Sequence, residues 1–244
     1  LYIYTIQNIS TVLTKFLFGS LAGLAVISVI GTYSRGGFVG LLIVTVRVLL
    51  NVKHKILFLI IGLVFAVAAV NVASDKWSAR IGSIQSAAEK DNSFLGRVTA
   101  WKIATVAAID NPIFGTGQDS IQNLYVWLHY YESISKLDFI GTENVSPEHA
   151  KAAHSIYFQV LGDAGFVGLG LYLTILFIAL SKSWKLGRDA KTEWVKSLGS
   201  SISTVLIVFM VSGGLLSLAY YDLIFAIISI VIALEKIELS ASEN

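Results

Sequence analysis

Long apolar stretches separated by polar connections dominate the chain. The apolar runs cover 16–33, 38–50, 56–73, 166–180, 198–218 and 223–234. A helix needs about 20 predominantly apolar residues to cross a bilayer. The pattern therefore predicts six membrane-spanning helices, of which the second and the last are short.

Two polar interruptions set the ends of these helices. The bend Ser34-Arg35-Gly36-Gly37 separates the first two apolar runs, and glycine favours turns over helix interiors. We expect two helices that meet at this bend; the alternative is one long tilted helix with Arg35 inside it. Residues 219–222 join the last two runs, and we expect them to form a tight turn.

Composition agrees with a membrane protein. Hydrophobic residues make up 55% of the chain, charged residues 14%, and the mean hydropathy is +0.72, whereas roughly a quarter of the residues in a soluble domain are charged. The net charge of +2 is too small to indicate nucleic-acid binding, and the chain has no cysteine for a thiolate site. The predicted fold is all-α: a polytopic transmembrane bundle of about six spans.

Basic residues predict the orientation of the bundle. Three cations, Arg47, Lys53 and Lys55, lie at the end of the second run and in the connection that follows it, and five lie in 182–196. Short basic loops stay in the cytoplasm, so the polar section between these connectors should face outward. We expect three parts: transmembrane helices in 1–73, a large, partly helical periplasmic loop in 74–153, and transmembrane helices in 154–244.

The predicted loop has structure of its own. Residues 96–109 have helical composition, with Arg97 and Trp101 on one face, and this helix should end before Pro112. A glycine turn follows at 113–119. A second helix is expected at 120–135, where the aromatic residues suit the level of the lipid headgroups. They are Tyr125, Trp127, Tyr130 and Tyr131.

His154 stands where the polar section gives way to an apolar run. Read as a helix, His154, Tyr157, Phe158 and Leu161 share one face. Gly162 and Gly165 should interrupt that helix. A lone histidine in such a place is more often a boundary residue than a catalytic base.

Arg35, Arg97 and His154 indicate a functional site more strongly together than any of them does alone. Arg35 alone fits a snorkelling anchor, and Arg97 alone fits a solvated surface residue. The predicted topology places all three on the outer face. Arginine binds phosphate through two parallel hydrogen bonds, and histidine accepts a hydroxyl proton near neutral pH. Together they would suit a lipid-linked diphosphate, with no metal and no cofactor.

Two other kinds of site are disfavoured. The spacings of His129, His149 and His154 with Glu132 and Glu148 match no known metal signature. Residues 115–117 form a partial glycine loop without the strand and the lysine of a phosphate-binding loop. We therefore predict neither a metal site nor a nucleotide site.

Four motifs resemble the O-antigen ligase superfamily, which includes Wzy-type polymerases. They are Tyr33-Ser-Arg35-Gly-Gly37, Gly96-Arg97-x-x-x-Trp101, Asn111-Pro-x-Phe-Gly-x-Gly117, and Ala153-His154-Ser-x-Tyr157-Phe-Gln-x-Leu-Gly-x-x-Gly-x-Val-Gly168. The last is most similar to the O-glycosylation ligases associated with exosortase systems. It has Ser155 where asparagine is more widespread, which bears on the acceptor class. Members of the superfamily are longer, so the chain resembles their C-terminal half.

The resemblance implies an enzyme of the bacterial inner membrane with its active site facing the periplasm. Such a ligase transfers a glycan from undecaprenyl diphosphate to an acceptor hydroxyl, inverting the anomeric carbon without a metal. Arg35 and Arg97 match the arginines that bind the diphosphate, and His154 matches the catalytic histidine that activates the acceptor. The implied partners are a lipid-linked oligosaccharide donor, a protein or lipid acceptor, and membrane lipids.

Two alternatives remain at this point. A Wzy-type polymerase would use the same chemistry but transfer to another lipid-linked glycan. A transporter or structural membrane protein would use the arginines only as anchors. That class is expected to carry polar or helix-breaking residues at mid-membrane depth, and the sequence shows few, chiefly Gly213-Gly214.

Overall fold

Helices make up nearly all of the regular structure. The computed structural model describes residues 12–32, 34–51, 92–137 and 145–243, and within these residues it contains α-helices, short 3-10 helices and turns but no strand. The predicted all-α class is confirmed. The chain divides into two units: 1–59, 174–212 and 220–244 form unit 1, and 60–173 and 213–219 form unit 2.

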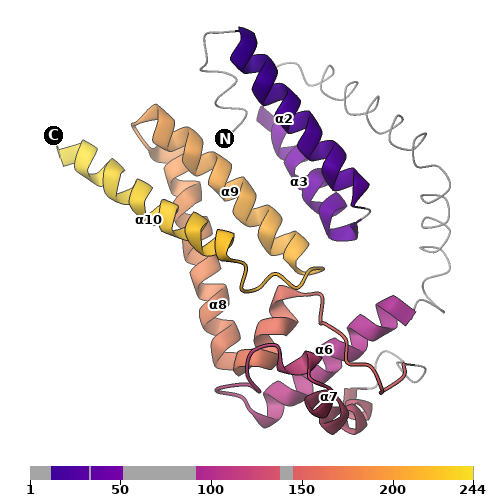
Figure 1. Cartoon of the computed structure of the whole chain (residues 1–244). Helices are drawn as coiled ribbons and strands as arrows, with labels where there is room; N and C mark the ends of the chain where they lie inside the picture. The colour runs from indigo at the N-terminus through magenta and orange to yellow at the C-terminus, as the bar shows by residue number, and fades with distance from the viewer. Residues whose placement is uncertain (1–11, 33, 52–91, 138–144, 244) are drawn as a thin grey trace. The chain divides into compact units, whose positions relative to one another are not determined.

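Unit 1 begins with a hairpin of two apolar helices. Helix α2 (Val12–Gly31) packs along α3 (Arg35–Asn51), as Figure 1 shows. The amide of Gly37 donates to the hydroxyl of Ser34 at 3.3 Å. A Cβ atom on Gly37 would lie 3.1 Å from Val29, so the missing side chain permits the close approach. Two helices meeting at Arg35 are confirmed, and the alternative of one long helix is wrong.

The rest of unit 1 packs through small residues and an ion pair. A Cβ atom on Gly40 of α3 would lie 3.0 Å from the hydroxyl of Ser212, in α9 (Glu193–Gly213). Gly187 approaches the backbone of Ser200 equally closely. In α10 (Asp222–Glu243), Glu235 forms an ion pair with Lys182. Small residues allow helices to approach where lipid supplies no hydrophobic drive for association.

Among the described residues, two helices meet the length and hydropathy expected of a membrane span. They are α8 (Ile156–Asp189) and α9. Helices also occupy the predicted first, second and last spans, as α2, α3 and α10. The predicted span at 56–73 lies outside the described residues. A six-span bundle therefore stays a prediction.

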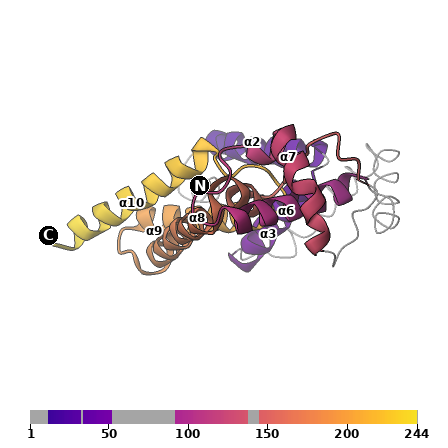
Figure 2. The same ribbon diagram turned by 90° about the horizontal axis from the view of Figure 1, so that it is seen from below.

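Unit 2 has its own hydrophobic core. Helix α6 (Asn92–Asp110) packs against α7 (Leu124–Tyr131) and the 3-10 helices η1 (Ser120–Gln122) and η2 (Glu132–Leu137) (Figure 2). The predicted helix at 96–109 is confirmed. The predicted second helix is present, but it is divided at Asn123, whose side chain caps α7 by accepting from the Tyr125 amide.

The aromatic residues of α7 differ in burial. Trp127 is fully buried and Tyr130 nearly so. Both belong to this core, so headgroup placement is wrong for them; Tyr125 is 87% exposed.

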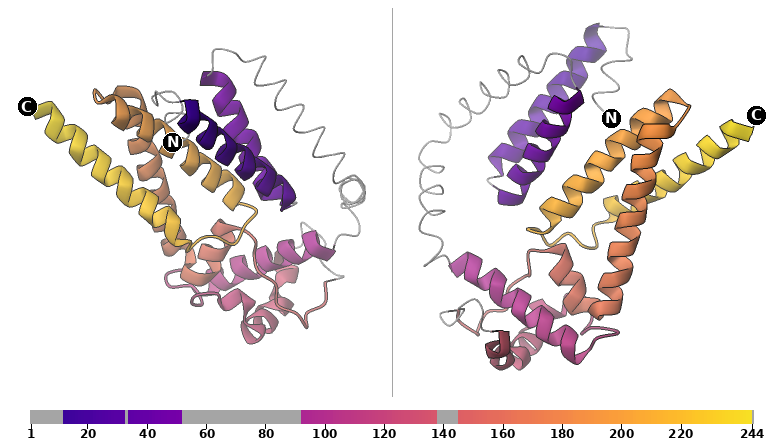
Figure 3. Two further views of the ribbon diagram at one scale, coloured as in Figure 1. Left: turned by 45° about the horizontal axis from the view of Figure 1, so that its top comes forward. Right: turned by 180° about the vertical axis from the view of Figure 1, so that it is seen from behind.

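Helix α8 bends sharply near its start. Gly165 has a left-handed φ of 69° and separates a short arm, 156–164, from a long arm, 166–189 (Figure 3). A side chain strongly disfavours that conformation, and glycine does not. The predicted interruption at Gly165 is confirmed. Gly162 instead stays helical, facing Ile121 and Ala104.

The connection between α9 and α10 differs from the prediction. Helix α9 ends at Gly213, not at Leu218, and the connection runs over 214–221 in place of a tight turn at 219–222. The helix ends where two consecutive glycines disfavour its continuation. Residues 213–219 then belong to unit 2.

Candidate functional site

His154 lies on an irregular segment immediately before α8. Its φ is 46°, in the left-handed region, and the helix begins at Ile156. The prediction that His154 shares a helix face with Tyr157 and Phe158 is therefore wrong. The neighbours Ala153 and Ser155 are buried while His154 is exposed, so the backbone turns this one residue outward.

Helix α6 fixes the chain on either side of His154. The indole N–H of Trp101 donates to the carbonyl oxygen of Ala153 at 2.6 Å. The same indole stacks on Phe158, with ring centroids 5.0 Å apart and planes inclined by 9°. Trp101 thus contacts both the residue before His154 and the first turns of α8.

Arg97 influences the charge of His154. Partial burial lowers the pKa of His154 from its ordinary value of 6.5, and the positive charge of Arg97 lowers it further. Both effects disfavour the imidazolium ion. At neutral pH the ring is therefore neutral and has a nitrogen lone pair available to accept a proton.

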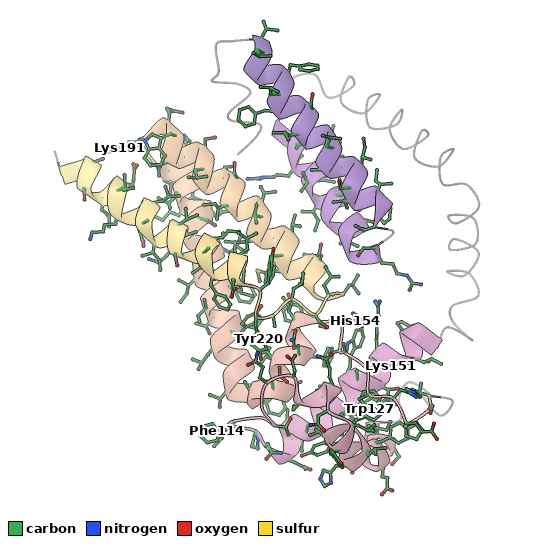
Figure 4. All side chains as sticks on the ribbon, in the orientation of Figure 1. Phe114, Trp127, Lys151, His154, Lys191 and Tyr220 are labelled. Carbon is green, nitrogen blue, oxygen red and sulfur yellow. The ribbon has the colours of Figure 1, made fainter. Side chains whose placement is uncertain are left out.

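Lys151 adds a second cation that sequence reasoning missed. It precedes His154 by three residues, and Figure 4 shows both side chains on the segment that follows the 145–150 turn. A Cβ atom on Gly96 would lie 2.5 Å from Cδ and 2.9 Å from Nζ of Lys151. The ammonium group thus occupies space that glycine leaves open, one residue before Arg97. The sequence did contain a signal for Lys151, because this cation lies only three residues before His154.

The glycine turn supports the bend of α8. The Thr116 amide donates to the carbonyl oxygen of Gly162, and the Gly117 amide donates to that of Asp163, both at 3.0 Å. The Phe166 amide donates to the carbonyl oxygen of Pro112 at 2.9 Å. The turn and the bend are therefore one hydrogen-bonded structure, which explains why the third and fourth motifs occur together.

Arg35 belongs to unit 1 and is exposed at the first turn of α3. Gly36, next to it, is buried. The described structure brings Arg97 and His154 together within unit 2. The convergence of Arg35 with them stays a prediction.

Other groups carry no site of their own. Among the described residues no group of three histidine, cysteine, aspartate or glutamate side chains is placed to hold a metal ion. Ser155 is 1% exposed, so its hydroxyl is buried and does not face an acceptor.

These features define a helical protein with apolar helices long enough to cross a membrane, in which an exposed histidine lies near an arginine of α6. Residues 20–173 match the model of the O-antigen ligase family, and the chain belongs to that family. The match contains Arg35, Arg97 and His154. No curated protein and no solved structure matches the chain. Family members are membrane-embedded glycan ligases and polymerases, so the chain is of the O-antigen ligase or polymerase type.

Proposed function

We propose that the protein transfers a glycan from undecaprenyl diphosphate to an acceptor hydroxyl at the periplasmic face of the bacterial inner membrane. The observation that carries the proposal is the setting of His154: an exposed imidazole, held neutral beside Arg97. A neutral imidazole accepts a proton from a hydroxyl group, and a neighbouring guanidinium binds a diphosphate. The family match supports the reaction class.

In the proposed reaction His154 is the catalytic base. The acceptor hydroxyl gives its proton to the imidazole as its oxygen attacks the anomeric carbon. The bond from that carbon to the diphosphate oxygen breaks, and its electron pair leaves with undecaprenyl diphosphate. Attack opposite the leaving group inverts the anomeric carbon, and neither a metal nor a cofactor takes part.

Arg97 and Arg35 are proposed to bind the diphosphate. Negative charge grows on the leaving phosphate as the bond breaks, and positioned guanidinium groups stabilise it most in the transition state. Partial burial and then the charge of Arg97 lower the pKa of His154, which favours its deprotonated form before the reaction. Protonation of His154 would prevent catalysis, so one arginine would serve both binding and base activation.

The polymerase alternative differs only in the acceptor. It uses the same three residues and the same bond changes, but the acceptor hydroxyl belongs to a second lipid-linked glycan. The resemblance of the histidine motif to O-glycosylation ligases favours a ligase over a polymerase, so transfer to a protein or lipid acceptor is the proposed activity. A transporter role has no support from the family match.

His154→Ala tests the proposal, with His149→Ala as the matched control because His149 is also exposed and lies five residues away. Purified protein is incubated in detergent with lipid-linked oligosaccharide and candidate acceptors. Loss of a positioned general base lowers transfer by roughly 10²- to 10⁴-fold, whereas the control stays near the wild-type rate. Normal transfer by His154→Ala would overturn the assignment. The product shows whether protein, lipid or a growing polymer received the glycan.

A further inference from the structure

The backbone conformation of His154 needs external support. A residue other than glycine in the left-handed region is strained, and it stays there only when its surroundings hold it. His154 has a φ of 46°. Trp101 donates to the carbonyl oxygen of Ala153 on one side of the planar peptide unit that joins Ala153 to His154. The His154 amide, on the other side of that unit, needs an acceptor of its own.

That amide is held by a residue distant in sequence. The N–H of His154 donates to the hydroxyl oxygen of Ser217 at 2.9 Å. Ser217 lies in the 213–219 segment that follows α9, within the same unit as His154. Gly213 brings that segment close, because a Cβ atom there would lie 2.6 Å from Cδ1 of Ile156.

The far end of the segment is fixed through both polar groups of the Ala219 backbone. The Ala219 amide donates to Oε1 of Gln159 at 3.3 Å, and its carbonyl oxygen accepts from the Tyr172 hydroxyl at 3.2 Å. Gln159 also donates from Nε2 to Asp119 at 3.3 Å. The two arms of α8 thus each hold Ala219, two residues beyond Ser217.

We propose that Ser217 is a positioning residue that holds His154 in its left-handed conformation and so directs the imidazole toward the acceptor, with Gln159 and Tyr172 anchoring the segment that carries it. The inference rests on the proposed function of His154. It extends that function by naming a residue outside 20–173, the range of the family match.

Removing the Ser217 hydroxyl should affect catalysis more than folding. His154 is exposed, so water can accept from its amide when the hydroxyl is absent, and the penalty of a buried unsatisfied donor does not arise. The peptide unit that joins Ala153 to His154 then keeps its bond from Trp101 but loses the one to Ser217, so the conformation of His154 is less firmly fixed. A small misplacement of a catalytic group can cost up to about a hundredfold in rate.

Ser217→Ala, Ser217→Thr and Ser135→Ala test the inference. Threonine retains the accepting oxygen. Ser135 is an exposed serine in the same unit, whose hydroxyl bonds to Glu132 in its own turn, so it matches the chemical change without touching His154. We expect Ser217→Ala to lower kcat roughly ten- to hundredfold with little change in KM for the donor. Ser217→Thr should restore most of the loss, and Ser135→Ala should behave as wild type.

A second measurement does not depend on activity. Hydrogen exchange of the His154 amide should speed up in Ser217→Ala and return toward the wild-type rate in Ser217→Thr. Unchanged exchange and unchanged kcat in Ser217→Ala would overturn the positioning role while leaving the proposed function intact. If the wild-type protein transfers no glycan, the proposed function fails, and the exchange result alone decides whether Ser217 holds His154.

Discussion

Trp101 and Ala153 are joined by a hydrogen bond of 2.6 Å from the indole N–H to the main-chain carbonyl, 52 residues apart in sequence. The bond fastens α6 to the residue that precedes His154. Because the same indole stacks on Phe158, hydrogen bonding and stacking can be separated by a single substitution.

Trp101→Phe removes the hydrogen bond and retains an aromatic ring. We expect the free energy of unfolding in detergent to fall by about 0.5–1.5 kcal/mol, and transfer to slow because the chain before His154 loses an anchor. Trp194→Phe is the control, since Trp194 is 42% exposed in unit 1. Equal stability and equal turnover in Trp101→Phe would show that the bond positions nothing.

Arg97→Gln should alter the pH dependence of the free enzyme. The Arg97 cation lowers the pKa of His154, so its removal raises that pKa, although burial still lowers it. More of the base is then protonated at any pH near the pKa. The acidic limb of the kcat/KM profile should move to higher pH, in addition to any loss of donor binding.

Titration of the His154 ring by NMR separates the two effects of Arg97→Gln, because it needs no substrate. Lys185→Gln removes an exposed cation from unit 1 and should leave the titration unchanged. A His154 pKa that stays the same or falls in Arg97→Gln would contradict the electrostatic account.

Gly96→Ala should separate stability from donor binding. Alanine gains roughly 1 kcal/mol over glycine in a helix interior. Its Cβ would occupy the space now held by Cδ and Nζ of Lys151, and the end of a flexible side chain can move at little cost. We expect unchanged or slightly raised stability, together with a higher KM for the donor because a cation beside Arg97 is displaced.

Gly23→Ala is the control for the Gly96 substitution, since a Cβ atom at Gly23 would meet open space in α2. Thermal unfolding and donor titration are measured on all three proteins. A Gly96→Ala protein with unchanged KM would show that the Lys151 ammonium group does not contribute to donor binding.

Local pattern predicted the helices well. The apolar runs located α2, α3, α8, α9 and α10, and the composition around Arg97 located α6. Ends set by glycine or proline were also predictable at Arg35, Pro112 and Gly165, because these residues restrict or free the backbone wherever they occur. The end of α9 was missed, since the apolar run continues past Gly213 into residues that leave the helix.

The site was predictable in its residue types but not in its geometry. Helical periodicity placed His154 on a helix face, whereas long-range bonds from Trp101 and to Ser217 hold it outside the helix. No local signal marks Ser217, because its partner lies 63 residues away. Arg97 and Trp101 were correctly assigned to one helix, but only the folded chain shows that their electrostatic and hydrogen-bonding effects meet at His154.

Gly165→Ala should strongly destabilise unit 2. Gly165 has a φ of 69°, and a Cβ there would lie 2.6 Å from the carbonyl oxygen of Pro112. Strained backbone alone costs of order 1–3 kcal/mol, and backbone atoms cannot move aside as a side chain can.

Gly170→Ala is the matched control, five residues along the same helix, where a Cβ meets nothing within 4 Å. We expect a clear fall in the unfolding temperature for Gly165→Ala and none for Gly170→Ala. The bend holds the short arm of α8 against the turn at 112–117, so transfer activity should fall together with stability in Gly165→Ala. Equal stability of the two variants would show that the bend does not depend on glycine.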